Sequence, residues 1–135
     1  MRAFREAVEA GDMAAVEALL AEDVVFTSPV VFKPYPGKAI TAAILRAVSQ
    51  VFEDFRYDRE LSGADGRDHA LVFAARVGDR ELTGCDFIHV DDDGLIDELT
   101  VMVRPLSGAQ ALAAAMGARF EEIAKEAEAR SAAAS

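Results

Sequence analysis

The stretch GCDFIHVDDDGLIDELTVMVRP, residues 84–105, predicts two strands joined by a tight acidic turn. β-branched and aromatic residues fill both halves, and the DDDG between them is typical of a hairpin turn. On the second strand Leu99, Val101 and Val103 share one face, whereas Met102 lies on the other. Because apolar residues occupy both faces, we expect this sheet to be covered on both sides.

Two further strands precede this hairpin, at FRYDREL (55–61) and HALVFAARV (69–77). Short turn sequences separate the four segments, so they predict an antiparallel meander. Upstream, VVFTSPVVF (24–32) predicts another strand, in which Pro29 marks an edge or a bend. The following KPYPGK (33–38) predicts a loop, because it contains two prolines and a glycine.

Helical spacing of apolar residues covers the rest of the chain. Residues 4–20 predict two helices broken at Gly11, with Asp12 as the N-cap of the second. A third helix is predicted around 40–52, and a last one begins after Ser107. The apolar stripe of that last helix comprises Leu112, Met116, Phe120 and Ile123. Helices followed by a strand meander predict an α+β fold.

Length and composition limit the classes of protein to consider. A chain of 135 residues predicts one domain, with residues 1–106 forming its main body and 107–135 a C-terminal helix whose end frays. Its 14 Lys and Arg against 24 Asp and Glu give a formal net charge of −10, which argues against nucleic-acid and anionic-membrane partners.

Cysteine and histidine counts restrict the chemistry further. One cysteine, Cys85, allows no intrachain disulfide, and two histidines with one cysteine are too few for a Cys/His zinc site. The turn at 91–94 lacks the spaced ligands and closing Glu of an EF-hand calcium loop. No stretch approaches a membrane span or a signal peptide. We therefore expect a cytoplasmic protein that uses no metal and no cofactor.

Three stretches resemble the nuclear transport factor 2-like superfamily, whose members include ketosteroid isomerase and the SnoaL-like polyketide cyclases. They are FREAVEAGDMAAVEALLAEDVVFTSPV (4–30), PYPGKAITAAIL (34–45) and CDFIHVDDDGLIDEL (85–99). The resemblance implies a cone-shaped, curved antiparallel sheet wrapped by N-terminal helices, the cystatin-like roll, followed here by a C-terminal helix. Because this fold hosts unrelated activities, it predicts structure better than function.

The resemblance implies a catalytic role for one acid. Asp86 matches the protonated aspartate of ketosteroid isomerase, but Phe4 stands at its oxyanion-hole tyrosine and Ser28 at its general-base aspartate. Standard steroid isomerisation needs a carboxylate to shuttle the proton, so the sequence argues against that mechanism. SnoaL-like cyclases use a single aspartate as acid and base, a requirement that Asp86 can still meet.

The resemblance also implies a ligand pocket inside the cone. Its predicted wall consists of Phe4, Phe26, Ser28, Tyr35, Ile44, Val48, Phe73, Ala75, Ile88, Leu99, Val101 and Val103. An aspartate in such apolar surroundings loses hydration, which raises its pKa. A second interpretation stays open, in which Asp86 pairs with Arg104, Tyr57 or a backbone amide and has a structural role. Tyr57 itself fits an interface or surface position better than an acid.

Two functional hypotheses follow. The first is a pocket protein for a hydrophobic, carbonyl-bearing metabolite, in which Asp86 catalyses a metal-free isomerisation, cyclisation or dehydration. The second is a non-catalytic protein that binds an apolar ligand or a partner subunit, with the cone filled by its own side chains in the latter case. In each case we expect a homodimer joined through the outer sheet face at Cys85, Phe87 and Met102.

Overall fold

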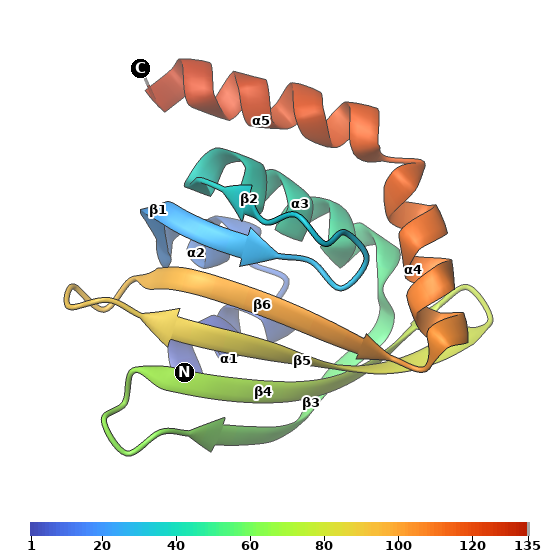
Figure 1. Ribbon diagram of the computed structural model, residues 1–135, viewed down its shortest axis with the longest axis horizontal. Helices are drawn as coiled ribbons and strands as arrows, with labels where there is room; N and C mark the ends of the chain where they lie inside the picture. Colours follow the sequence, from blue (N-terminus) through green and yellow to red (C-terminus); the bar gives the residue numbers. More distant parts are fainter. Residues whose placement is uncertain (135) are drawn as a thin grey trace.

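The computed structural model describes residues 1–134, in which five helices accompany one six-stranded sheet (Figure 1). The helices are α1 (Arg2–Glu9), α2 (Met13–Ala18), α3 (Lys38–Val51), α4 (Leu106–Gly117) and α5 (Phe120–Ala134). The strands are β1 (Leu20–Thr27), β2 (Tyr35–Pro36), β3 (Glu53–Ser62), β4 (Asp68–Val77), β5 (Arg80–Val90) and β6 (Ile96–Arg104). Ser135, the end of the predicted 107–135 segment, lies outside the described residues.

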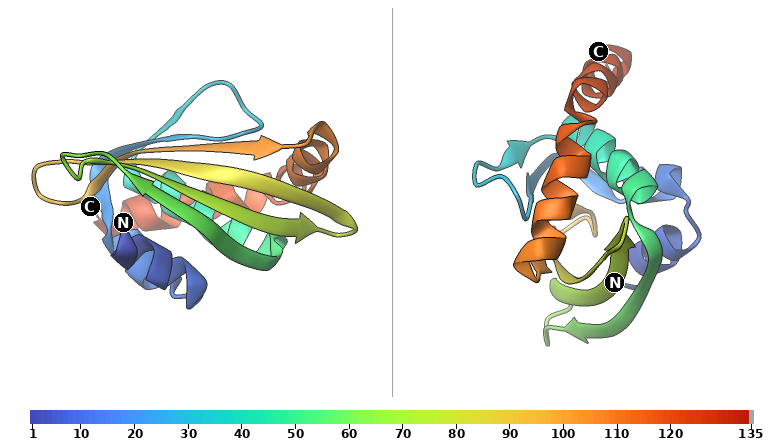
Figure 2. Two further views of the ribbon diagram at one scale, coloured as in Figure 1. Left: turned by 90° about the horizontal axis from the view of Figure 1, so that it is seen from below. Right: turned by 90° about the vertical axis from the view of Figure 1, so that its right-hand side faces the viewer.

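The strands follow the order β2-β1-β6-β5-β4-β3 in a curved, unclosed sheet (Figures 1 and 2). Strands β3 to β6 form the predicted antiparallel meander, so the predicted α+β fold with a curved sheet is confirmed. One pairing departs from the antiparallel pattern. The chain passes through β2, α3 and the three strands β3 to β5 before β6 returns beside β1, and strands β1 and β6 run parallel.

The helices cover the concave face of this sheet (Figure 2). Helices α1, α2 and α3 lie against it, α5 packs along α3, and α4 contacts β4, β5 and β6 at the end of the meander. The opposite face has no covering element within residues 1–134, and Phe87 and Met102 are 43% and 59% exposed there.

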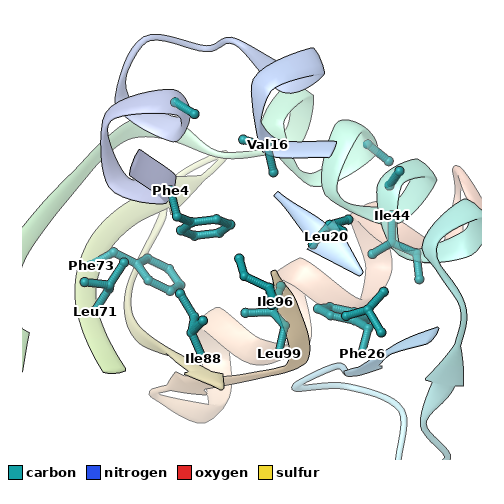
Figure 3. Packing of buried hydrophobic residues seen from close by; sticks show 14 of the residues in the cluster. Phe4, Val16, Leu20, Phe26, Ile44, Leu71, Phe73, Ile88, Ile96 and Leu99 are labelled. Carbon is teal, nitrogen blue, oxygen red and sulfur yellow. The ribbon is translucent and has the colours of Figure 1, made fainter. Parts of the chain in front are cut away.

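The core lies between the helices and the concave face. Figure 3 shows Phe4 and Val16 from the first two helices above Phe73, Ile88 and Leu99 of the sheet. Inward and outward residues alternate along β5, where Leu82, Gly84, Asp86, Ile88 and Val90 are buried. This alternation follows from the two-residue period of a strand.

The backbone of Gly84 in β5 lies directly beneath the Phe73 ring. A Cβ atom placed on Gly84 would be 2.3 Å from Cζ of Phe73 and 2.8 Å from the carbonyl oxygen of Met102. Real Cβ atoms essentially never approach other atoms so closely. The absence of a side chain here therefore allows the aromatic ring to lie flat against the sheet.

Three predicted boundaries near the N-terminus are wrong. Helix α2 ends at Ala18, with Asp12 as its predicted N-cap, and the strand begins already at Leu20 and ends at Thr27. The strand ends there for two reasons. The Ser28 hydroxyl oxygen accepts hydrogen bonds from the backbone amides of Val30 and Val31, and Pro29 has no backbone N–H to donate to a neighbouring strand. The predicted loop at 33–38 contributes the two residues of β2.

The predicted single C-terminal helix is two helices, α4 and α5, separated near Ala118 and Arg119. The break changes the direction of the predicted stripe, so Leu112 and Ile123 are buried whereas Phe120 is about half exposed. None of the helices within residues 1–134 is both long and apolar enough to cross a membrane.

Candidate functional site

A cavity of about 370 Å³ lies between the concave face of the sheet and the helices. Its walls come from α1, α3, the inner faces of the sheet, the segment after β1, and both C-terminal helices. Small-molecule sites typically have volumes of about 300–1,000 Å³, so the cavity has room for one small ligand.

The structure brings most of the predicted wall together around this cavity. The predicted residues that line it are Phe4, Phe26, Ser28, Tyr35, Ile44, Val48, Phe73, Leu99 and Val101, and Asp86 joins them. Ala75, Ile88 and Val103 are not part of the lining. The prediction that these three residues line the cavity is therefore wrong.

These three residues face inward but lie outside the cavity, where Ala75 and Ile88 are buried and Val103 is half-buried. Ile88 is packed in the core beside Phe73 (Figure 3). Ala75 and Val103 lie at the end of the sheet where α4 crosses, and Gly108 of that helix allows its backbone to approach Leu82 closely. An alternation pattern identifies which face a residue lies on, but not which part of that face is filled.

The C-terminal helices close one side of the cavity. Leu112, Met116, Phe120 and Ile123 line it, and they form the apolar stripe seen in the sequence. The helical spacing of this stripe predicted a C-terminal helix, but these residues were not part of the predicted pocket wall. An apolar stripe at helical spacing shows that a helix packs, but not on what it packs.

Asp86 is the only buried carboxylate within the described residues, with 8% of its surface exposed. It faces the cavity from β5, where it pairs in register with Val101 of β6 and Leu71 of β4. Burial raises the pKa of Asp86 from its ordinary value of 3.8 to about 7, although the hydrogen bond from Tyr57 partly opposes this shift. The carboxyl group therefore exists in both forms near neutral pH.

The partner of Asp86 is Tyr57, whose hydroxyl donates to Oδ2 at 2.9 Å. The prediction that Tyr57 occupies an interface or surface position is wrong, because this residue is 7% exposed and lines the cavity. Burial, followed by the charge of Asp86 and the hydrogen bond to it, raises the pKa of Tyr57 well above its usual range. Tyr57 therefore stays protonated and acts as a hydrogen-bond donor.

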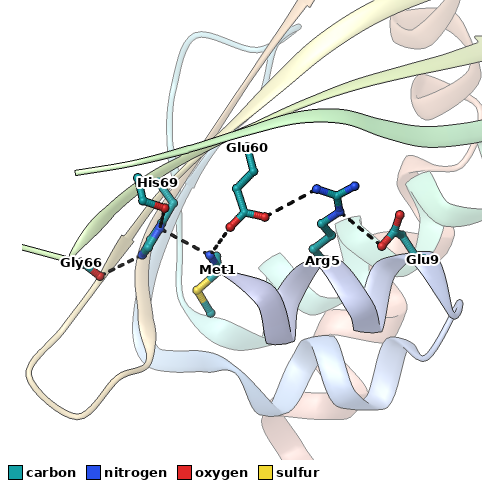
Figure 4. Close-up of polar contacts among 7 residues, drawn as sticks. Met1, Arg5, Glu9, Glu60, Gly66 and His69 are labelled. Atoms are coloured by element: carbon teal, nitrogen blue, oxygen red, sulfur yellow. Dashed lines mark hydrogen bonds and ion pairs between the residues drawn. The ribbon is translucent and has the colours of Figure 1, made fainter. Parts of the chain in front are cut away.

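Two neighbouring side chains contact the ring of Tyr57. Phe55 meets it edge-on with ring centroids 4.9 Å apart, and the Arg5 guanidinium lies over the ring, 5.8 Å from its centroid. Arg5 is itself placed between Glu60 of β3 and Glu9 of α1 (Figure 4). These contacts restrict the ring and so favour the position in which its hydroxyl bonds to the carboxylate.

Three more hydroxyl groups line the cavity: Ser49 on α3, and Ser28 and Tyr35 near the edge of the sheet opposite to that of Tyr57. Ser28 follows β1, and its Oγ accepts hydrogen bonds from the backbone amides of Val30 at 3.1 Å and Val31 at 3.0 Å. Tyr35 lies in β2, opposite Phe26 in register, with the two ring centroids 6.4 Å apart. The side chains of Ser28 and Tyr35 are half-buried.

The remaining candidate residues lie outside the cavity. Arg104 is exposed at the end of β6, where it donates to Thr83, and is not near Asp86. His69 bonds to Ser62 and to the carbonyl of Gly66 at the turn between β3 and β4 (Figure 4). Cys85 is half-buried on the outer face, and burial raises the pKa of its thiol.

The acidic turn between β5 and β6 has a structural role. Asp91 Oδ1 accepts from the backbone amides of Asp93 and Leu95, which closes the turn. Beyond it, His89 bonds to Asp97 at 2.6 Å, and Asp97 holds the pKa of this histidine above its usual value. Both groups are partly exposed on the outer face, away from Asp86.

Comparisons with known proteins agree with this architecture. Residues 1–99 match the family model of the SnoaL-like domain. A structure described as a steroid delta-isomerase from Pseudomonas aeruginosa is 48% identical, with a TM-score of 0.84, covering 88% of this chain and 87% of that one. An uncharacterised cystatin-like protein from Silicibacter pomeroyi is 38% identical, with a TM-score of 0.86 over 94% of this chain and 91% of that one.

A structure described as a putative ketosteroid isomerase from Kribbella flavida is more distant, at 27% identity and a TM-score of 0.62, and covers 77% of this chain and 74% of that one. A search of the curated proteins found no match. The family match covers well over half of the chain and stops at Leu99, before α4 and α5. The chain therefore belongs to the SnoaL-like domain family within the nuclear transport factor 2-like superfamily.

Proposed function

We propose that this protein binds a hydrophobic, carbonyl-bearing small molecule and catalyses a metal-free proton transfer, with Asp86 as the acid and base. The observation that carries the proposal is a buried carboxyl group, with a pKa of about 7, facing an apolar cavity of about 370 Å³. A proton-transfer group works best when its pKa lies near the working pH. Ordinary solvated aspartates do not meet this condition at neutral pH.

One carboxyl group is sufficient for an isomerisation. The carboxylate takes a proton from the carbon between the ligand carbonyl and a neighbouring C=C double bond, and the electron pair of the broken C–H bond moves into a dienolate. The carboxylic acid then returns the proton to a different carbon, so no oxidant or other reactant is consumed. Tyr57, which stays protonated, can donate to the carboxylate or to the ligand oxygen.

The similarity to a protein described as a steroid delta-isomerase supports this class of reaction but does not transfer its substrate. Phe4 lines the cavity without a hydroxyl, and the Ser28 hydroxyl is no base at neutral pH. In the ketosteroid isomerase pattern one aspartate transfers the proton and a second, protonated aspartate binds the ligand oxygen. We propose that Asp86 is the only aspartate that takes part here. For this reason we name a substrate class rather than a steroid.

The first test is a carboxyl-carbon NMR titration of Asp86, with the Asp86→Asn variant to assign the resonance. We expect a midpoint near pH 7 in the free protein. Tyr57→Phe should raise it further, on the order of one unit, because the anion loses its hydrogen-bond donor. A midpoint near 4, or a lower one in Tyr57→Phe, would contradict the assignment of Asp86 as a poised acid.

The alternative is a binding protein without turnover, which the replacement of two polar catalytic positions by Phe4 and Ser28 favours. Incubating the protein with 2-acetylnaphthalene in D₂O separates the two functions. Deuterium that enters the acetyl methyl group in the presence of the wild type, but not of Asp86→Asn, supports proton transfer. Binding without exchange supports the alternative. The version in which a filled cone serves a partner subunit loses its support because the cavity is open.

We also propose that the protein is a cytoplasmic homodimer, joined through the outer face of the sheet. Phe87 and Met102 are exposed on neighbouring strands of this face. Cys85, opposite Met102 in register, adds a third, weakly polar side chain to the same patch. Sedimentation equilibrium should give about twice the 14.4 kDa chain mass for the wild type and one chain mass for Phe87→Asp. A monomeric wild type, or a Phe87→Asp dimer, would contradict this interface.

A further inference from the structure

The polar side chains that the sheet side of the cavity presents gather at two separate places, and the remaining polar lining residue, Ser49 of α3, is exposed and donates its hydroxyl to the carbonyl of Arg46. Asp86 on β5 and Tyr57 on β3 form the first, and Ser28 after β1 with Tyr35 on β2 form the second. We call them the acid pole and the hydroxyl pole. Strand β6 lies between β5 and β1 in the sheet, and its inward residues there are Leu99 and Val101.

The strand register places the two poles level with each other. Asp86 pairs with Val101, and Thr27 pairs with Thr100 in the parallel β1–β6 ladder. Ser28 follows Thr27 and is therefore level with Val101 as well. Neighbouring strands are about 4.8 Å apart, so two spacings separate the backbones of Ser28 and Asp86 by roughly 10 Å. A ligand that touches both poles must lie across the apolar floor of β6.

The hydrogen bonds of Ser28 determine what its side chain can offer. Its oxygen already accepts from two backbone amides, of Val30 and Val31, which occupy both lone pairs. Only the hydroxyl proton remains for a ligand, so Ser28 acts as a donor. Tyr35 makes no hydrogen bond through its hydroxyl to any residue within 1–134, and this group can donate or accept.

We propose that the natural ligand carries a second, uncharged oxygen on the far side of its apolar skeleton, which the hydroxyl pole binds. The Ser28 hydroxyl donates to this oxygen, and Tyr35 completes its hydrogen bonding when the oxygen belongs to a hydroxyl group. The ligand class is thus a flat hydroxyketone or diketone rather than a simple ketone. This inference rests on the proposed function, which places the ligand carbonyl at the acid pole.

The oxygen must be uncharged because no lysine or arginine belongs to the lining drawn from residues 1–134. A carboxylate or phosphate placed among apolar side chains without a cation would lose its hydration with no compensation. Asp86 adds to this cost whenever it is ionised. The site therefore discriminates between a hydroxyl group and a carboxylate at the same position of a ligand.

The test compares three probes with the same skeleton on the full-length protein. They are 2-acetylnaphthalene, its 6-hydroxy derivative and its 6-carboxy derivative, and fluorescence titration gives the Kd of each. Since a hydrogen bond contributes about 0.5–1.5 kcal/mol net, we expect the hydroxyl group to lower Kd by about 2- to 10-fold and the carboxylate to abolish binding.

The ratio of the Kd values for the plain and the hydroxy probe is the decisive quantity. Any change in the loop that follows β1 affects both probes and cancels in this ratio. We expect the ratio to fall to about one in the double variant Ser28→Ala/Tyr35→Phe, and to stay at the wild-type value in Ser28→Thr, which keeps the hydroxyl. Tyr35→Phe alone removes one oxygen atom and leaves the backbone bonds of Ser28 in place.

A wild-type ratio near one, or a ratio that the double variant leaves unchanged, would overturn the hydroxyl pole while leaving the proposed function standing. The carbonyl end of the ligand has its own control variant, Asp86→Leu. We expect this variant to raise the Kd of the plain and the hydroxy probe by the same factor. If Asp86→Leu binds both probes as tightly as the wild type, the placement of the carbonyl at Asp86 is wrong. Failure of both probes to bind the wild type would contradict both proposals.

Discussion

Replacing Asp86 with asparagine is expected to raise the free energy of unfolding by about 4 kcal/mol at pH 8 and to change it little below pH 4. The folded-state pKa of about 7 lies roughly three units above the ordinary 3.8, and each unit corresponds to about 1.4 kcal/mol. Ionising Asp86 in its buried position therefore destabilises the folded protein, and asparagine removes that cost while keeping an oxygen for Tyr57.

The direction of the pH dependence follows from proton binding. Between pH 4 and pH 7 the folded protein holds the Asp86 proton and the unfolded chain has released it, so the contribution of this group to stability falls as the pH rises. Urea unfolding of the wild type and Asp86→Asn at half-unit pH steps should give curves that separate across this window. Asp58→Asn, an exposed position on β3, is the matched control. Parallel curves for wild type and Asp86→Asn would contradict the raised pKa.

The second large effect is expected from Gly84→Ala, which should destabilise the protein by about 3 kcal/mol. The new methyl group would lie 2.3 Å from the Phe73 ring and 2.8 Å from the Met102 carbonyl oxygen, and the latter belongs to the backbone of the neighbouring strand. Phe73 is almost completely buried and stacks on Phe55 with centroids 5.0 Å apart, so it has little room to move aside.

Thermal unfolding followed by circular dichroism measures this effect. Gly117→Ala is a suitable control, because a Cβ atom there has no other atom within 4 Å and a helix tolerates alanine well. We expect the control to unfold at the wild-type temperature or slightly above it. Equal unfolding temperatures for Gly84→Ala and the wild type would show that the Phe73 ring can shift without cost.

Much of the fold could be predicted because its elements have clear periodicity. The four strands of the meander and α3 are where alternation and helical spacing placed them. The boundaries near Leu20 and Ser28 were wrong because backbone hydrogen bonding decides them, and apolar spacing does not report it. The parallel β1–β6 pairing brings together residues about 70 positions apart, which no local pattern can show.

The acid could be predicted from the sequence, whereas Tyr57 was only one of three candidate partners and was assigned to another position. Asp86 is a charged residue inside an apolar strand, and the resemblance to the nuclear transport factor 2-like superfamily implied that it faces the interior of the cone. Tyr57 was assigned to an interface or surface because the alternation of FRYDREL places it with Arg59 and Leu61 on one face. The register of β3 on β4 shifts between Tyr57 and Arg59, so this shared face breaks, and Tyr57 turns inward while Leu61 is exposed.

The cavity has two kinds of wall with different origins. The acid and its tyrosine stand on strands within the matched family domain, whereas α4 and α5, which close one side, lie beyond it. Exchanging the last 30 or so residues would therefore alter the size and shape of the cavity and leave the hydrogen-bonded pair of Asp86 and Tyr57 in place. In evolutionary terms, the volume of the cavity can diversify at the carboxyl end while the sheet that carries the buried acid stays the same.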